Sequence, residues 1–253
     1  MNLLSNVLWL ILTMAMLAWL QIRLHREVQL FFLLITRNPK LAILLFSLVF
    51  LPGVFLHELS HYLAAKLLRV RTGRFSILPR DKGDGTLQLG FVEISATDPI
   101  RESLIGAAPL LAGSVFVSVA GISYLKLDAI WAALVQQGLG EGISELFVLF
   151  KQPDVWLWLY LALAVSSTMF PSSSDRRPMT KLLIGLVLLL TVVLLFGAGV
   201  WLLNLVGPGV TRTLGAASVI FGVSAGLHLM LLIPLALIRR LLVDLIGVKV
   251  STA

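Results

Sequence analysis

The chain has 253 residues, of which 58% are hydrophobic and only 13% are charged, and its mean hydropathy is +0.97. This composition is typical of an integral membrane protein and excludes an ordinary soluble domain. The net charge of +7 arises from few charges, which indicates basic cytoplasmic loops rather than a nucleic-acid-binding surface. The chain contains no cysteine, so disulfides, thiolate catalysis and cysteine-ligated metal sites are excluded.

Long apolar runs predict an all-α polytopic membrane protein with about six transmembrane helices. The first run lacks the basic flank and cleavage motif of a signal peptide, so we expect it to be retained. The basic segment 21–40 contains only a short apolar piece, which predicts an interfacial amphipathic segment with His25 at the interface. Pro52 and Gly53 predict a kink in the second helix. The six runs are residues 3–20, 41–68, 103–125, 155–170, 182–205 and 214–238.

Residues 69–102, between the second and third runs, have a different character. Segments 71–78 and 86–94 are rich in β-branched and aromatic residues, and the sequence Asp-Lys-Gly-Asp-Gly at 81–85 favours a turn between them. We therefore expect a small membrane-associated β-hairpin. The next connection, residues 126–154, is predicted to be a loop with one amphipathic stretch at 129–150.

Basic residues are distributed unevenly among the loops. They gather in the hairpin region, after the fourth run and after the sixth, whereas the loops 126–154 and 206–213 have no such excess. The positive-inside rule therefore places the hairpin, the polar break at 171–178 and the C-terminal end in the cytoplasm. On this count the basic segment 21–40 falls on the opposite side, and interfacial placement reduces this conflict without removing it.

The second apolar run contains His57-Glu58-Leu59-Ser60-His61. In a helix the two histidines project from one face, where they can share a zinc ion, and Glu58 can act on a water molecule beside it. The alternative is a helix with two hydrogen-bonded histidines. Because three ionisable residues in an apolar span are costly and usually mark function, we favour a site for one Zn²⁺ ion.

A catalytic zinc site normally has three protein ligands, so a third must come from elsewhere in the chain. Asp175 lies in the polar break after the fourth run, at a depth compatible with His61 if that segment dips into the membrane. The alternative for Asp175 is a solvated interfacial cluster with Arg176 and Arg177. The acids of the loop 126–154 lie on the wrong side, whereas three on the right side fall in the hairpin or at its exit: Glu93, Asp98 and Glu102.

The order of these features resembles the site-2 protease family of intramembrane zinc metalloproteases. In that family an HExxH helix is followed by a β-hairpin, then by a span with an A-G-P-type motif. A later span carries an N-x-x-P…L-D-G motif whose Asp is the third metal ligand. This chain has Ala107-Ala108-Pro109 and Thr168-Met169-Phe170-Pro171-Ser172-Ser173-Ser174-Asp175 in that order. The resemblance covers about residues 41–178, and it implies that His57, His61 and Asp175 hold the metal with Glu58 as the catalytic base.

The later motifs depart from the family pattern. Thr168 stands where the family has Asn, Ala108 replaces Gly, and Ser174 and Arg176 flank Asp175 in place of Leu and Gly. We expect Thr168 and the serines Ser172, Ser173 and Ser174 to line the path of substrate or water. His228 in the sixth run is either a second-shell or oxyanion-stabilising residue or a helix–helix hydrogen-bonding partner, and we favour the last.

The resemblance implies an enzyme that cleaves transmembrane protein substrates within a lipid bilayer, without any nucleic-acid partner. An unwound substrate would bind to the exposed edge of the hairpin. We expect a prokaryotic cell membrane, with the active site near its cytoplasmic face. Two alternatives remain: a zinc hydrolase for another membrane-associated substrate, and a catalytically inactive relative that binds partners; the sequence does not specify the oligomeric state. The expected units are an N-terminal helix with its interfacial segment (1–40), a catalytic core (41–178) and a two-helix extension (179–253).

Overall fold

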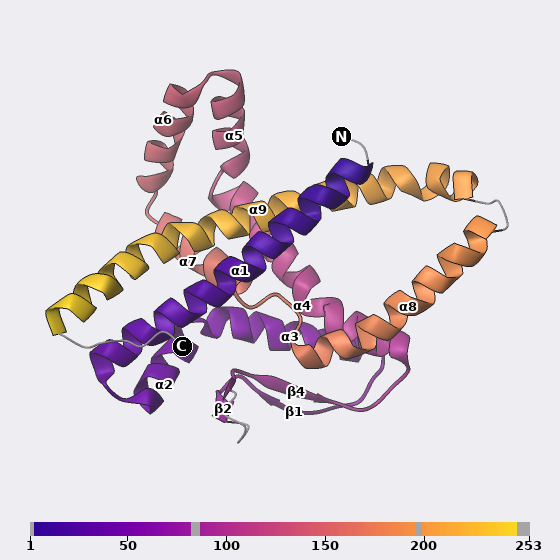
Figure 1. The fold of residues 1–253 in the computed structure, drawn as a ribbon, viewed down its shortest axis with the longest axis horizontal. Helices are drawn as coiled ribbons and strands as arrows, with labels where there is room; N and C mark the ends of the chain where they lie inside the picture. The colour runs from indigo at the N-terminus through magenta and orange to yellow at the C-terminus, as the bar shows by residue number, and fades with distance from the viewer. Residues whose placement is uncertain (1–2, 82–86, 196–198, 247–253) are drawn as a thin grey trace.

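The computed structural model describes residues 3–81, 87–195 and 199–246, and most of them are helical (Figure 1). Three helices are long and apolar enough to cross a membrane, or up to five if each of two bent pairs is one span. The all-α fold is therefore confirmed and is consistent with a membrane protein, but the expected number of six spans is wrong. The three long spans are Leu3–Thr36, Pro99–Tyr124 and Asn204–Asp244.

Helix α1, Leu3–Thr36, continues through the region where an interfacial segment was expected. Its buried apolar positions recur at helical spacing from Leu17 to Val28, and no proline or glycine interrupts them. A single helix therefore buries one continuous apolar stripe, which outweighs the polar residues on its other faces. His25 lies on this helix against the rings of Phe46 and Phe50. Its location at the membrane interface stays a prediction.

The second apolar run forms two helices, α2 (Pro39–Val49) and α3 (Leu51–Leu67), which meet at an angle of 66°. The predicted kink is confirmed. Asn38 caps α2 through its side-chain oxygen, and Pro52 lies in the first turn of α3, where its missing N–H costs nothing. Gly53 lets α3 approach helix α7 (Val155–Ser166), because a Cβ there would lie 2.1 Å from the carbonyl oxygen of Ala164.

The expected β-hairpin is present beside α3 (Figure 1). Strand β1 (Thr72–Ser76) pairs antiparallel with β4 (Phe91–Ile94), and a register shift lies between Thr72 and Phe75. The short strands β2 (Arg80–Asp81) and β3 (Leu87–Gln88) continue the hairpin towards its tip. The predicted turn at 81–85 lies, apart from Asp81, outside the described residues.

Helix α4, Pro99–Val119, continues as a π-helical turn, Ala120–Tyr124, before the region predicted as a loop. That region instead forms a helical hairpin of α5 (Leu127–Gln136) and α6 (Leu139–Phe150). Gly138 separates the two helices at a φ of 101°, a conformation that favours glycine. Helix α7 (Val155–Ser166) follows α6 at an angle of 98°, so the predicted fourth span is a short helix in a bent pair.

Helix α8, Ser173–Leu195, and helix α9, Gly199–Ile246, divide the predicted fifth span between them, while the sixth lies within α9. Apolarity continues across both helices, so hydropathy alone does not locate the break. Helix α9 packs along α1 (Figure 1), where Asn6 donates to the carbonyl of Thr211 at 2.9 Å. Glu27 of α1 also pairs with Arg239 of α9. The N- and C-terminal long helices thus lie against each other beside the bundle of α3, α4, α7 and α8.

Candidate metal centre

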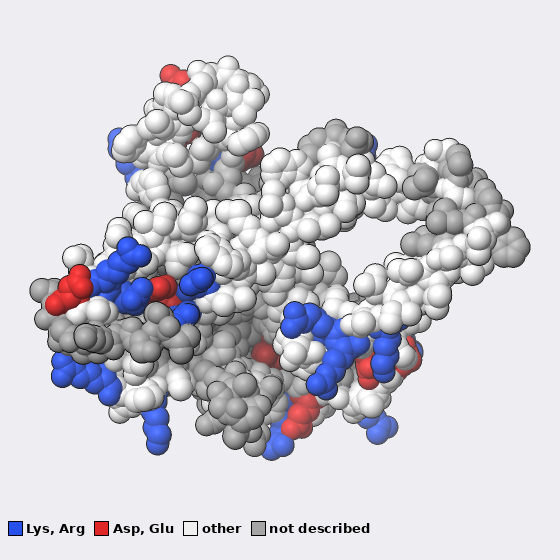
Figure 2. All heavy atoms as spheres, in the orientation of Figure 1, with Lys and Arg blue, Asp and Glu red and all other residues white. Residues whose placement is uncertain are grey.

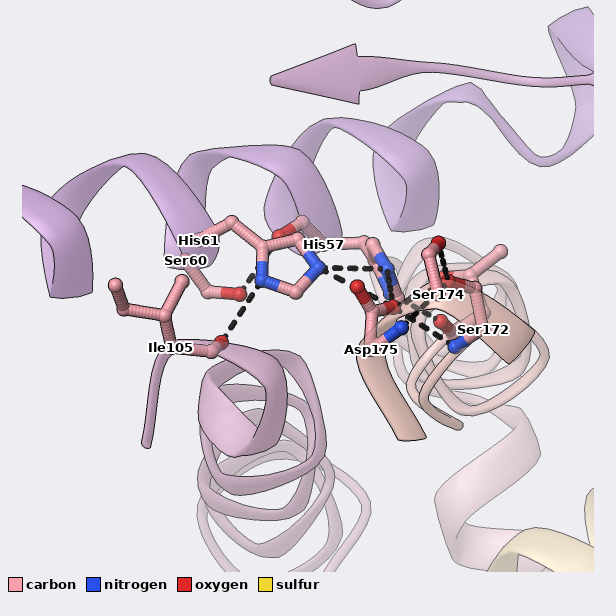
Figure 3. Close-up of polar contacts among 8 residues, drawn as sticks. His57, Ser60, His61, Ile105, Ser172, Ser174 and Asp175 are labelled. Atoms are coloured by element: carbon pink, nitrogen blue, oxygen red, sulfur yellow. Dashed lines mark hydrogen bonds and ion pairs between the residues drawn. The ribbon is translucent and has the colours of Figure 1, made fainter. Parts of the chain in front are cut away.

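Helix α3 presents His57 and His61 on one face, as their spacing of four residues requires (Figure 3). The two Nε2 atoms are 3.3 Å apart. Asp175, at the start of α8, directs Oδ2 towards both rings, at 3.9 Å from Nε2 of His57 and 3.6 Å from Nε2 of His61. The structure therefore brings together the three residues that were predicted as metal ligands.

The geometry of these ligand atoms suits a small metal ion. The three residues each offer a ligand atom, and these atoms all lie within 4.8 Å of one another. A tetrahedral zinc ion with bonds of about 2.0 to 2.2 Å would separate its ligand atoms by about 3.4 Å. The observed separations are close to that value, so His57, His61 and Asp175 could bind a metal ion with little movement.

Asp175 is held by the cap of its own helix. Its Oδ2 accepts hydrogen bonds from the main-chain N–H of Ser172 at 2.8 Å and from the Ser172 hydroxyl at 2.6 Å. The N–H of Asp175 points back to the same hydroxyl at 3.4 Å, so Ser172 and Asp175 form a capping box at the start of α8. The two hydrogen bonds from Ser172 favour the ionised carboxylate, which is the form that binds a metal.

Each imidazole is oriented by a main-chain carbonyl. Nδ1 of His57 donates to the carbonyl of Thr168 at 2.6 Å, and Nδ1 of His61 donates to the carbonyl of Ile105 at 2.8 Å. A proton on Nδ1 leaves the lone pair of Nε2 free to bind a metal. In metal sites, a hydrogen bond from the ring nitrogen that does not bind the metal fixes the ring orientation and tautomer.

Both of these carbonyls lack the usual donor of an α-helix. Helix α4 contains Pro109, which has no N–H to donate to the carbonyl of Ile105 four residues earlier. Thr168 lies just beyond the end of α7 at Ser166, where helix carbonyls also lose their partners. The fold thus supplies one free acceptor from a proline inside a helix and another from a helix end.

Close packing of α4 against α8 brings Asp175 to the histidines. A Cβ on Gly106 would lie 2.7 Å from the carbonyl oxygen of Asp175, which is too close for any other residue. Gly106 also directly follows Ile105, whose carbonyl holds His61. One short segment of α4 therefore positions two of the three ligands.

The centre opens into a cavity of about 670 Å³. Its walls come from α1, α3, the hairpin, the start of α4 and the start of α8, and Glu58 lies in its lining beside the two histidines. Gly90 faces this carboxylate closely, because a Cβ there would lie 2.8 Å from Cγ of Glu58. The hairpin therefore covers the side of the site on which Glu58 lies.

The other acids considered as ligands have different partners. Glu93 pairs with Arg74 at 2.8 Å on the hairpin, and Asp98 caps α4 through the N–H groups of Ile100 and Arg101. The carboxylate of Glu102 accepts from the N–H of Thr97. Among the described residues, the group that could hold a metal is His57, His61 and Asp175.

The residues expected along the substrate or water path lie mostly at the cavity. Thr168, Ser172, Ser173 and Ser174 all contribute to its lining. The hydroxyl of Thr168, however, donates to carbonyls of the preceding helix α7, at 3.2 Å from both Ala164 and Val165. His228 is fully buried with Nε2 at 2.8 Å from the hydroxyl of Ser167, which is the helix–helix hydrogen bond that we favoured.

Several residues at the centre were not identified from the sequence. The capping pattern Ser172-x-x-Asp175 and the four-residue spacing from Ile105 to Pro109 are visible in the sequence and could have been recognised. Gln21 and His25 also line the cavity, but they come from a distant helix whose packing no local pattern predicts. In comparisons with family models, curated proteins and solved structures, no match to this chain was found.

Proposed function

We propose that this protein is an intramembrane zinc metalloprotease similar to the site-2 proteases. The observation that carries the proposal is the convergence of Asp175 on the HExxH histidines, from a helix more than a hundred residues away in the chain. Two histidines that did not bind a metal would not need a carboxylate beside them at the separation expected between ligands of a tetrahedral metal ion. The adjoining cavity and the buried Glu58 further support a site that performs chemistry.

His57, His61 and Asp175 would hold the zinc ion, which would supply Lewis-acid chemistry for the scissile carbonyl and for a water molecule. Glu58 then accepts the proton of the attacking water and delivers it to the leaving nitrogen. Its side chain is suited to this role because it projects from the same helix as the histidines and borders the cavity. The carbonyls of Thr168 and Ile105 keep both imidazoles in the required tautomer throughout.

The hairpin is the feature that favours a polypeptide as the substrate. Among the described residues, β4 pairs only with β1, so its second edge has no strand partner. Gly90, Phe91 and Val92 line the cavity next to Glu58. A transmembrane helix must unwind before its peptide bonds can be attacked, and the resulting extended segment can pair with this edge.

The charge distribution supports a site near the cytoplasmic face. Figure 2 shows Lys and Arg side chains gathered at the end of the molecule where α1 and α2 meet and around the start of α8. The basic ends of α1 and α2, which conflicted with the predicted orientation, lie in this view along the same lower side as the hairpin. By the positive-inside rule we place this side, with the start of α8, in the cytoplasm.

One observation favours a catalytically inactive binding protein. The hydroxyl of Thr168, at the position where the site-2 proteases carry Asn, is bonded to carbonyls of the preceding helix α7 and does not offer a donor to the cavity. The remaining polar groups of the lining would then hold a partner segment without cleaving it. This alternative predicts an intact metal site with no proteolysis.

The test begins with elemental analysis of detergent-purified wild-type protein beside His57→Ala, Asp175→Ala and Glu58→Gln. We expect about one zinc per chain in the wild type and in Glu58→Gln, and loss in the other two. Single-span membrane peptides are then incubated with each protein, and products are identified by mass spectrometry. Cleavage that falls at least 100-fold in Glu58→Gln supports the proposal. Zinc without cleavage supports the binding protein, and a wild type that cannot be loaded with zinc contradicts both.

A further inference from the structure

Two consecutive carbonyls at the end of α7 are bonded by side chains from two other helices. The carbonyl of Thr168 accepts from Nδ1 of His57, and the preceding carbonyl, of Ser167, accepts from the side-chain amide of Gln21 on α1. These carbonyls lie beyond the regular hydrogen bonding of α7 and would otherwise be orphaned. The acceptor that orients His57 is therefore adjacent to one held by α1.

The side chain of Ser167 is fixed from a third direction. Its hydroxyl is 2.8 Å from Nε2 of His228 on α9, and both residues are fully buried. Nδ1 of His228 donates to the carbonyl of Ser224 at 2.8 Å, so Nε2 carries the lone pair and accepts from the Ser167 hydroxyl. Both nitrogens of this histidine are thus committed, and its ring cannot turn without losing a buried hydrogen bond.

We propose that Gln21 and His228 are positioning residues of the metal centre, acting on His57 through Ser167 and Thr168. The peptide unit that joins Ser167 to Thr168 is planar, so fixing the Ser167 carbonyl also fixes the Cα of Thr168, and only φ and ψ of Thr168 remain between it and the Thr168 carbonyl. The carbonyl of Thr168 in turn sets the orientation and tautomer of His57. The inference rests on the proposed metal site, and it makes α1 and α9 part of that site.

The competing explanation is that these hydrogen bonds only join α1 and α9 to the bundle. The chain offers a matched control for it. Asn6 of α1 is buried and donates to the carbonyl of Thr211 of α9 at 2.9 Å, in the same pair of helices as Gln21 and His228. Asn6 does not line the cavity of the metal centre, so loss of its hydrogen bond weakens the helix pair alone.

The experiment compares wild-type protein with Gln21→Met, His228→Leu and the control Asn6→Leu. His228→Gln is added because its amide can return a hydrogen-bonding group to the hydroxyl of Ser167. The chain has only four histidines, so ¹⁵N-labelled imidazoles are resolved by NMR in detergent. Zinc affinity is measured by chelator competition, and thermal unfolding is recorded for every variant.

We expect metal-free wild-type protein to show His57 as the tautomer protonated at Nδ1, and Gln21→Met and His228→Leu to show mixed tautomers. Zinc affinity in these two should fall about 10- to 100-fold, as for other second-shell losses, with partial recovery in His228→Gln. Asn6→Leu should leave the His57 tautomer and the zinc affinity unchanged, even if it lowers the unfolding temperature as much as the other variants do.

The positioning role is overturned if the His57 tautomer and the zinc affinity change in Asn6→Leu as much as in Gln21→Met and His228→Leu. It is also overturned if they change in none of the variants. If wild-type protein binds no zinc but the His57 tautomer still depends on Gln21 and His228, the positioning role stands and the proposed function fails. If zinc binds tightly in all variants with an unchanged His57 tautomer, the metal site stands and the positioning role fails.

Discussion

Pro109 lies four residues after Ile105 in helix α4, so the carbonyl of Ile105 has no helical donor and accepts from His61 instead. A proline inside an apolar helix is normally destabilising, by about 3 kcal/mol or more. Here its effect is to release one acceptor for His61, a candidate metal ligand. Pro109 therefore favours the orientation of His61 but lowers the stability of α4, so the two effects are opposed.

This opposition predicts the behaviour of Pro109→Ala. The new N–H would compete with His61 for the carbonyl of Ile105, so zinc affinity should fall about tenfold while thermal stability stays the same or rises. Pro234→Ala in α9 is the control, because it also removes a proline inside a helix but does not alter the lining of the cavity. Equal zinc affinity in both variants would show that His61 does not depend on Pro109.

Gly106 is predicted to be intolerant of any side chain. In Gly106→Ala the new Cβ would meet the carbonyl oxygen of Asp175 at 2.7 Å, so α8 must move away and carry its carboxylate from the histidines. We expect zinc content to be lost while most of the helical circular dichroism remains. Gly185→Ala in α8, with nothing within 4 Å of its added Cβ, should bind zinc normally.

Ser172→Ala removes the capping box that orients Asp175. The variant loses the hydroxyl that donates to Oδ2, and we expect a stability loss of about 1 kcal/mol together with weaker zinc binding. Chemical unfolding and chelator competition measure the two effects separately. Ser173→Ala alters the next residue, which takes no part in the hydrogen bonds between Ser172 and Asp175. Normal values there would assign the effect to the cap.

We predict that His25 lowers the free energy of unfolding of the protein. Its Nε2 is buried without a hydrogen-bond partner among the described residues, and its ring lies against Phe46 and Phe50. His25→Phe keeps the aromatic contacts and removes the unsatisfied atom, so the free energy of unfolding should rise by about 1 kcal/mol. His228→Phe should instead lower it, because that ring has both nitrogens paired. A loss of stability in His25→Phe would mean that Nε2 has a partner in the folded protein.

The sequence predicted the parts of the site that local spacing encodes. His57, Glu58 and His61 share one turn of a helix, and the hairpin follows from turn residues between β-branched segments. The sequence did not predict where helices end when apolar residues continue without interruption, because periodicity does not show whether a helix stops. Helix α1 continues into segment 21–40 as far as Thr36, and the run at 182–205 is shared between α8 and α9.

Tertiary packing set the rest of the site. The position of Asp175 depends on the approach of α8 to Gly106, and the contact of Gln21 with Ser167 depends on where α1 crosses the bundle. Neither contact leaves a local pattern in the chain. Asp175 was reached from the sequence only by its depth in the polar break and by resemblance to the site-2 proteases.

The contact between Ser167 and His228 also bears on how the protein is made. A nascent chain emerges from its N-terminus, so α3 with both histidines is synthesised long before α9. Until α9 inserts, the hydroxyl of Ser167 has no imidazole to accept from it, and the segment that orients His57 stays unsupported. Under the proposed positioning role, a chain that still lacks α9 would bind metal more weakly, so the proposed hydrolytic activity would arise only at a late stage of synthesis.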